Sequence, residues 1–154
     1  MTRFMESRKY KSGWRWCLFR WTDVDPVGDG KTYLTRFHIF QTPYCSCMVH
    51  WLHLADPQPH LHDHPNDFLS VVLKGGYVEA FPASDNSDET IEKTVRRFNL
   101  VRATDRHKIL SVKPHTITLV FANRVRREWG FWVNGELVKW RDYIKMYRDG
   151  SFKS

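Results

Sequence analysis

The sequence predicts an all-β fold, a sandwich or barrel of about ten short strands with one short helix near the C-terminus. Two observations favour this fold. Runs of β-branched and aromatic residues recur at intervals of about ten residues and are separated by Gly, Pro, Asp and Asn. Aromatic residues make up 15% of the chain, including 7 Trp, and fall in extended-looking runs such as 14–21.

The candidate strands follow one another through turn segments that carry Gly, Pro, Asp or Asn, whose backbone preferences close turns. The strands are expected at 14–22, 32–41, 46–54, 68–74, 76–82, 93–99, 107–113, 116–123, 128–133 and 136–140. The main turn segments are 25–30, 41–43, 75–76 and 83–89.

The C-terminal part contains the clearest hairpin and the one expected helix. Asn134-Gly135 separates two apolar runs and supplies the positive φ values of a type I′ turn. After it, apolar residues recur at three- and four-residue steps, which predicts a helix over 140–148 with one stripe packed on the sheet. The stripe consists of Trp140, Tyr143, Ile144 and Tyr147.

Length and composition predict a single domain in a reducing compartment. A chain of 154 residues with 42% hydrophobic content can bury one core, expected over about 14–140. No apolar run approaches the roughly 20 residues that span a bilayer, and the N-terminal residues lack the apolar core of a secretion signal. We therefore expect a cytoplasmic protein with no membrane partner. The three cysteines, Cys17, Cys45 and Cys47, are too few for a disulfide scaffold and are interpreted as buried or half-buried thiols.

The formal charge of +7 raises the possibility of a nucleic-acid partner, because a basic surface attracts phosphates. The dense basic clusters are Arg96-Arg97 and 124–127, and no known nucleic-acid-binding signature accompanies them. Solvated strand faces or a site for an anionic small molecule explain them at least as well.

Three histidines at alternate positions, His60, His62 and His64, are the strongest candidates for a metal site. Side chains at i and i+2 project from the same side of an extended chain, so two imidazoles can converge on one ion. A helical pair, His60 with His64, is the competing geometry. The flanking prolines at 57, 59 and 65 remove amide donors and favour extended backbone, so the strand interpretation is preferred.

These residues and a later histidine resemble the cupin superfamily of small jelly-roll barrels. The segment 62–75, from His62-Asp-His64 through Val72 to Gly75, is similar to the first cupin motif, and 103–109 is similar to the segment with the histidine of the second. The resemblance covers residues 48–123. It implies a cupin-type jelly-roll β-barrel whose histidines hold a divalent metal ion at the mouth of a small cavity.

The ligand set departs from the cupin pattern at one place. The glutamate that the resemblance leads us to expect four residues after the second histidine is Phe68. Asp67 stands one residue early and would reach the site only through a bulge. We therefore expect a three-histidine site of His62, His64 and His107, with His60 as a spare or neighbouring group and Asp67 as a possible fifth candidate.

Three neutral imidazoles leave a divalent ion with its full charge and with open coordination positions. Among cupins, thiol dioxygenases use an all-histidine iron site, and 61–64 with Arg106-His107 is similar to their ligand segments. Their Ser-x-His-x-Tyr segment would fall near 118–122, which lacks both the His and the Tyr. Fe(II) is the expected ion, with Zn, Mn and Ni as alternatives.

Other polar groups could complete the site. Arg126 or Arg124 could pair with a substrate carboxylate or phosphate, or could simply blunt an exposed strand edge. Arg36 is a weaker candidate for the same role, and Tyr77 could line the cavity or fill the core. The remaining histidines are expected in the core or near a ligand (His38, His50 and His53) or in a turn (His115).

Three functions remain open. The leading hypothesis is a metal-dependent cupin, an iron oxygenase that acts on a small anionic molecule; a zinc or manganese ion would instead indicate hydrolysis or isomerisation. The second is a non-catalytic cupin that binds a small ligand or a protein partner, and the third a basic nucleic-acid-associated protein. A homodimer is an expectation from the resemblance to cupins.

Overall fold

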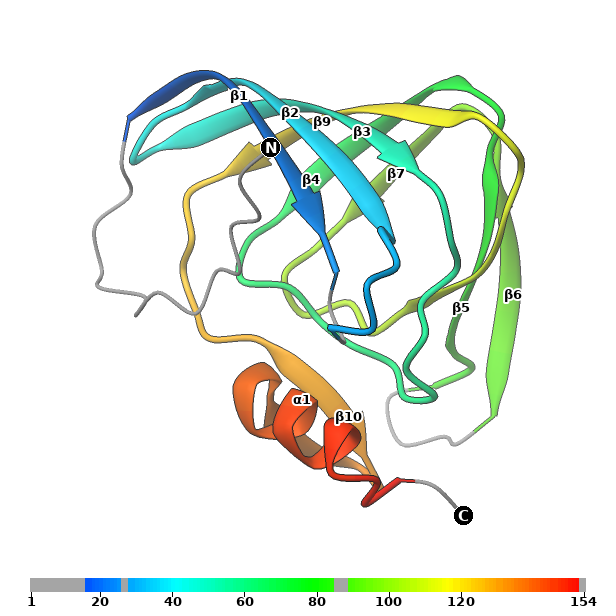
Figure 1. Cartoon of the computed structure of the whole chain (residues 1–154). Helices are drawn as coiled ribbons and strands as arrows, with labels where there is room; N and C mark the ends of the chain where they lie inside the picture. Colours follow the sequence, from blue (N-terminus) through cyan, green and yellow to red (C-terminus); the bar gives the residue numbers. More distant parts are fainter. Residues whose placement is uncertain (1–15, 26–27, 85–88, 153–154) are drawn as a thin grey trace.

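Two antiparallel sheets face each other and a small C-terminal unit lies at one end of them (Figure 1). The computed structural model describes residues 16–25, 28–84 and 89–152. The strands are β1 (Cys17–Val24), β2 (Leu34–Gln41), β3 (Cys45–Leu52), β4 (Phe68–Lys74), β5 (Tyr77–Pro82), β6 (Thr90–Val95), β7 (Phe98–Val101), β8 (Lys108–Val112), β9 (Thr116–Asn123), β10 (Gly130–Val133) and β11 (Glu136–Lys139). The larger sheet has the order β1-β2-β3-β9-β4-β7, the smaller β6-β5-β8, and β10 pairs with β11.

The single strand expected over 93–99 is wrong, because the chain forms two strands there. β6 pairs with β5 in the smaller sheet, whereas β7 pairs with β4 in the larger one. Arg96 and Arg97 form the bend between them. The chain must change sheets at this point, and a continuous strand could not pair with both neighbours. The first two residues of the strand expected at 14–22 lie outside the described residues.

Along each strand, residues that face the space between the sheets alternate with residues that face outward, as the two-residue period of a strand requires. Two buried apolar clusters fill the interior. One gathers Leu34, Leu52, Tyr77, Val95 and Ile109, and the other gathers Met48, Val120 and Ala122 with Phe68 packed against them. Tyr77 therefore belongs to the core, where it is 5% exposed.

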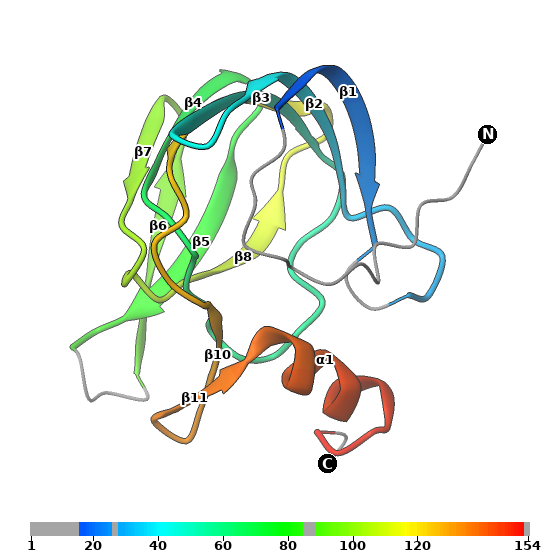
Figure 2. The ribbon, with the colours of Figure 1, turned by 90° about the vertical axis from the view of Figure 1, so that its left-hand side faces the viewer.

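The C-terminal unit consists of the β10–β11 hairpin and helix α1 (Trp140–Arg148), and it lies below the two sheets (Figure 2). The helix matches the predicted range. Of the predicted stripe, Tyr143 and Ile144 are buried, and the Tyr143 ring stacks on Phe131 of β10 with 3.9 Å between centroids. The helix thus packs on its own hairpin. No helix among the described residues is long and apolar enough to cross a membrane.

Candidate metal centre

Backbone pairing brings the histidine segments together. His62 and His107 form an isolated antiparallel bridge in which each amide donates to the other residue's carbonyl oxygen at 2.9 Å. On its other side His62 is bridged to Phe131 of β10. The segment 61–64 therefore runs as a short extended piece between the start of β8 and the C-terminal hairpin. This extended course is the one that the flanking prolines predict.

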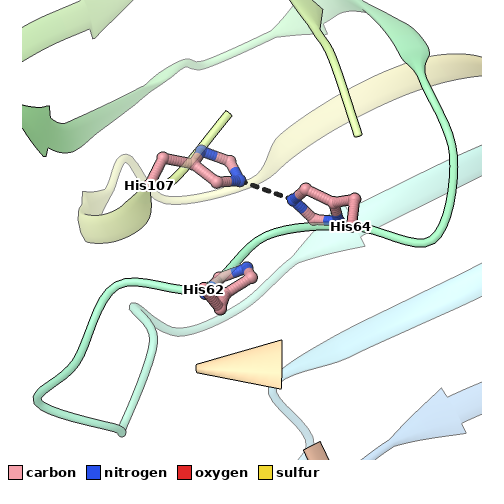
Figure 3. Close-up of side chains that lie close together, drawn as sticks. All are labelled: His62, His64 and His107. Atoms are coloured by element: carbon pink, nitrogen blue, oxygen red, sulfur yellow. Dashed lines mark hydrogen bonds between the residues drawn. The ribbon is translucent and has the colours of Figure 1, made fainter. Parts of the chain in front are cut away.

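The three imidazoles of His62, His64 and His107 converge on one point (Figure 3). One ring nitrogen from each lies within 4.8 Å of the other two. The Nε2 atoms of His64 and His107 are 2.7 Å apart. His62 and His64 are half-buried and His107 is buried. This is the set of histidines that the sequence singles out as ligands.

The environment of His62 and His64 favours neutral rings. Burial lowers the pKa of His62 to about 4, an effect that Asp56 partly opposes and His107 reinforces. The pKa of His64 is held well below its ordinary value by burial and by the neighbouring His107, His62 and Arg36. Neutral imidazole is the form that ligates a metal, so these rings are available as donors at neutral pH.

A buried carboxylate orients His107. Nδ1 of His107 lies 2.9 Å from Oε2 of Glu79, which is 3% exposed, and this contact turns Nε2 toward the other histidines. Glu79 also accepts hydrogen bonds from the Asn99 amide at 2.9 and 3.0 Å, and Lys93 lies 3.3 Å from Oε1. Burial alone would raise the pKa of Glu79, but the contacts with His107 and Lys93 outweigh it and lower the pKa.

Asp63, between the two ligand histidines in sequence, points to the opposite side and anchors their segment. It is fully buried and pairs with the Arg127 guanidinium at 2.9 Å. Its Oδ1 accepts the Gly130 amide at 2.9 Å, and the Trp132 indole donates to Oδ2, the oxygen that pairs with Arg127, at 3.3 Å. A buried, fully bonded carboxylate of this kind fixes the course of the chain at the histidines.

Aromatic side chains border the histidine group. Phe68, at the position where the cupin glutamate is absent, meets the His64 ring edge-on with 4.9 Å between centroids. Phe131 lies 5.6 Å from the His62 ring, and Trp129 lies 6.1 Å from it. These rings give the group an apolar border, and apolar surroundings strengthen electrostatic interactions because they lower the local dielectric constant.

Two of the sequence-predicted ligands lie outside this group. His60 sits in a bend after Pro59, its Nδ1 lies 2.8 Å from the Tyr143 hydroxyl, and its ring packs against Phe152. Asp67 accepts hydrogen bonds from the Ala103 amide at 2.7 Å and the Asn123 amide at 3.0 Å. Each is therefore tied to a structural partner, and no bulge brings Asp67 into the group.

The two candidate arginines after β9 lie on the surface. Arg126 is largely exposed and lies 3.5 Å from Asp67, and Arg124 is exposed. Tyr77, the third candidate catalytic residue, accepts a hydrogen bond from Asn99 at 3.3 Å and so connects to Glu79 rather than to the rings. Arg36 of β2 is one of the groups that lower the pKa of His64, after burial and the two neighbouring histidines.

The remaining histidines fall into two groups. His38 and His50 belong to the interior, and the environment lowers the pKa of both, first through burial. His53 is exposed and its Nε2 lies 3.0 Å from the Thr35 hydroxyl. His115 has a φ of 59° between β8 and β9, so it is the turn residue that the sequence predicts.

Sequence comparisons find no match to this chain among protein families or curated proteins. Solved structures do match its fold. A structure described as a candidate mannose-6-phosphate isomerase from Ralstonia eutropha covers 68% of this chain and 99% of its own, with 15% identity and a TM-score of 0.51. The structure of HppE with Fe(II) covers 67% of this chain and 56% of its own, with 16% identity and a TM-score of 0.50. An RmlC-like cupin from Shewanella frigidimarina covers 71% and 86%, with 15% identity and a TM-score of 0.47.

Proposed function

We propose that this chain, a member of the cupin superfamily by its fold, binds a divalent metal ion through His62, His64 and His107 and acts on a small anionic molecule. One observation carries the proposal: three imidazoles from two distant segments converge within 4.8 Å. Surface histidines do not ordinarily meet in this way, because burying several basic groups together is unfavourable without a common ligand.

The donor set fits such an ion. Burial keeps the His62 and His64 rings neutral at pH 7, and Glu79 fixes the orientation of His107 from behind, as carboxylates do for metal-bound histidines. A divalent ion held by neutral imidazoles keeps its charge and supplies Lewis-acid or, with iron, redox chemistry to an anionic substrate. We therefore expect Fe(II) and an oxidative reaction, with Zn, Mn and Ni as the alternative ions.

The other residues have positioning roles. Phe68, Trp129 and Phe131 exclude water from the side of the group that they border. Asp63 and Arg127 hold the segment that carries the two adjacent ligands.

The test is elemental analysis of the protein purified without chelator or added metal. A His62→Ala/His107→Ala double variant is compared with His53→Ala, which changes an exposed histidine outside the group. We expect about one ion per chain in the wild type and in His53→Ala, and none in the double variant. Equal metal content in all three proteins would overturn the site.

The identity of the ion separates the remaining functions. Iron directs the work to oxygen-consumption assays with small acids, whereas zinc indicates hydrolysis, isomerisation or binding. Absence of metal from the wild type would favour a non-catalytic binding protein. Nucleic-acid binding that persists without metal and falls steeply with salt would favour the third hypothesis.

A further inference from the structure

One row of cross-strand partners runs through all six strands of the larger sheet and is apolar at every position. The adjacent row, which contains Met48 and Val120, belongs to the core, so this row faces outward. From β1 to β7 its members are Trp21, Phe37, Val49, Leu119, Val71 and Phe98. An antiparallel sheet that faces water on one side normally carries polar residues on that side. This outer side is therefore unlike an ordinary solvated one.

A second outward row lies beyond the core row and has the same character. From β1 to β7 its members are Leu18, Phe40, Cys47, Phe121, Leu69 and Leu100. Cys47 behaves as a small apolar side chain here, since it is buried. No charged residue interrupts either row. We call the two rows together the outer apolar face.

The area of the outer apolar face is that of a protein–protein interface. Five of its side chains are between 45% and 69% exposed: Leu18, Trp21, Phe98, Leu100 and Phe121. At about 200 Å² for a large side chain they present roughly 600 Å² to solvent, and the half-buried members of the rows raise this to about 800 Å². A stable interface takes about 800 Å² from each partner, whereas the largest apolar patch of a monomer is about 300–600 Å².

Aromatic stacking holds part of this surface in place. The Trp21 ring lies 4.6 Å from the Phe37 ring and 5.1 Å from that of Trp51, the next outward residue of β3. Side chains that are already ordered lose little conformational entropy when a partner covers them. Exposed tryptophans of this kind contribute strongly to the binding energy of interfaces.

We propose that the outer apolar face is a homodimer interface, covered by the same face of a second copy related by a two-fold axis. A two-fold interface pairs a surface with itself, and two uncharged rows meet without bringing like charges together. An anionic membrane would be recognised by cations within the surface, and the two rows contain none. In Figures 1 and 2 the larger sheet runs along the upper side with the C-terminal unit below, so a second copy on this face does not meet α1.

The experiment is sedimentation equilibrium of the full chain from about 1 to 100 μM. Leu100→Glu places a charge in one row and Phe98→Glu places one in the other, so the second variant serves if the first does not fold. Leu100→Met keeps the position apolar. The matched control is Leu137→Glu, which changes an exposed leucine of β11 in the C-terminal hairpin. Circular dichroism verifies the fold of each protein.

We expect the mass of two chains for the wild type, Leu100→Met and Leu137→Glu. In Leu100→Glu and Phe98→Glu the dissociation constant should rise about a hundredfold or more, because a two-fold dimer would bury two unpaired carboxylates. A dimer of unchanged affinity in both of these variants would overturn the proposal. A wild type that is monomeric over the whole range would also overturn it, and sedimentation of that monomer with phosphatidylserine vesicles would assign the face to a membrane instead.

Discussion

At the scale of the residue, Glu79 tests how the site is oriented, because its carboxylate contacts the candidate ligand His107. Glu79→Gln removes the carboxylate that accepts from Nδ1 of His107 while nearly preserving shape. We expect metal affinity to fall about tenfold to a hundredfold, as for other residues that orient metal-bound histidines. A competition titration with a zinc chelator measures it.

The matched control is Glu92→Gln on β6, an exposed glutamate opposite Ala80 in the ladder. It removes the same charge from a neighbouring strand, and its zinc affinity should equal that of the wild type. If Glu79→Gln also binds zinc as the wild type does, the carboxylate does not orient the ligand.

For His60 we expect the opposite result, a variant that keeps its metal. Its Nδ1 is held by the Tyr143 hydroxyl at 2.8 Å, so it serves the contact with the helix and not the metal. His60→Gln should keep the metal stoichiometry of the wild type, at a cost of about 1 kcal/mol for the lost hydrogen bond. Metal analysis and urea unfolding measure the two effects, and loss of the ion in a folded His60→Gln protein would place His60 among the ligands.

His38 predicts how stability depends on pH. Burial, with Arg36 and Arg20 as further causes, lowers its pKa from 6.5 to about 4 in the folded protein. Between these values the unfolded chain binds more protons than the folded one, so stability falls as the pH falls through this window. One such group changes the free energy of unfolding by at most about 1.4 kcal/mol for each pH unit within this window.

Urea unfolding of metal-free protein between pH 7 and pH 4 tests this effect. His38→Gln should show a shallower loss of stability toward low pH than the wild type, because one of the groups that must stay neutral is gone. Identical pH dependence of the two proteins would contradict the assignment.

At the scale of elements, the turn between β4 and β5 determines the position of β5, the strand that carries Glu79. Gly75 has a φ of 79°, and Gly76 donates its amide to the Thr116 hydroxyl at 3.0 Å. That hydroxyl lies 2.9 Å from the Gly76 carbonyl oxygen and 2.7 Å from that of Lys113. A Cβ on Gly75 would collide with Thr116. The turn and β9 are thus locked together.

Gly75→Ala should destabilise the protein by about 2 kcal/mol or more, since strain at positive φ and a steric clash act together. Gly30→Ala is the control, because Gly30 also has positive φ but nothing lies within 4 Å of its Cβ position. It should cost about 1 kcal/mol. Equal free energies of unfolding for the two variants would show that the Thr116 contact adds nothing.

For the whole molecule, the elements with strong local signals could be predicted from the sequence. Alternation and turn residues predict nearly all the strands, and the three- and four-residue steps after Asn134-Gly135 predict α1. The strand over 93–99 could not be divided, because the division depends on which sheet each half joins. That pairing is a long-range property of the fold.

The candidate site could also be predicted only in part from the sequence. His62 and His64 are close in sequence, and the resemblance to cupins supplies His107. The sequence does not predict the roles of Glu79 and Asp63, because their partners are distant in sequence. Glu79 reaches His107 only through the pairing of β5 with β8, where it is opposite Ile109. The available signal for Glu79 was that a charged residue stands at an inward position of an otherwise apolar strand.

The most direct test of the central claim is X-ray absorption spectroscopy of the metal-loaded protein at the edge of the bound ion. The account predicts about three imidazole nitrogens near 2.1 Å, with oxygen atoms in the other positions. In His62→Ala the imidazole contribution should fall by about a third. Sulfur in the coordination sphere, or an unchanged spectrum in His62→Ala, would contradict a three-histidine centre.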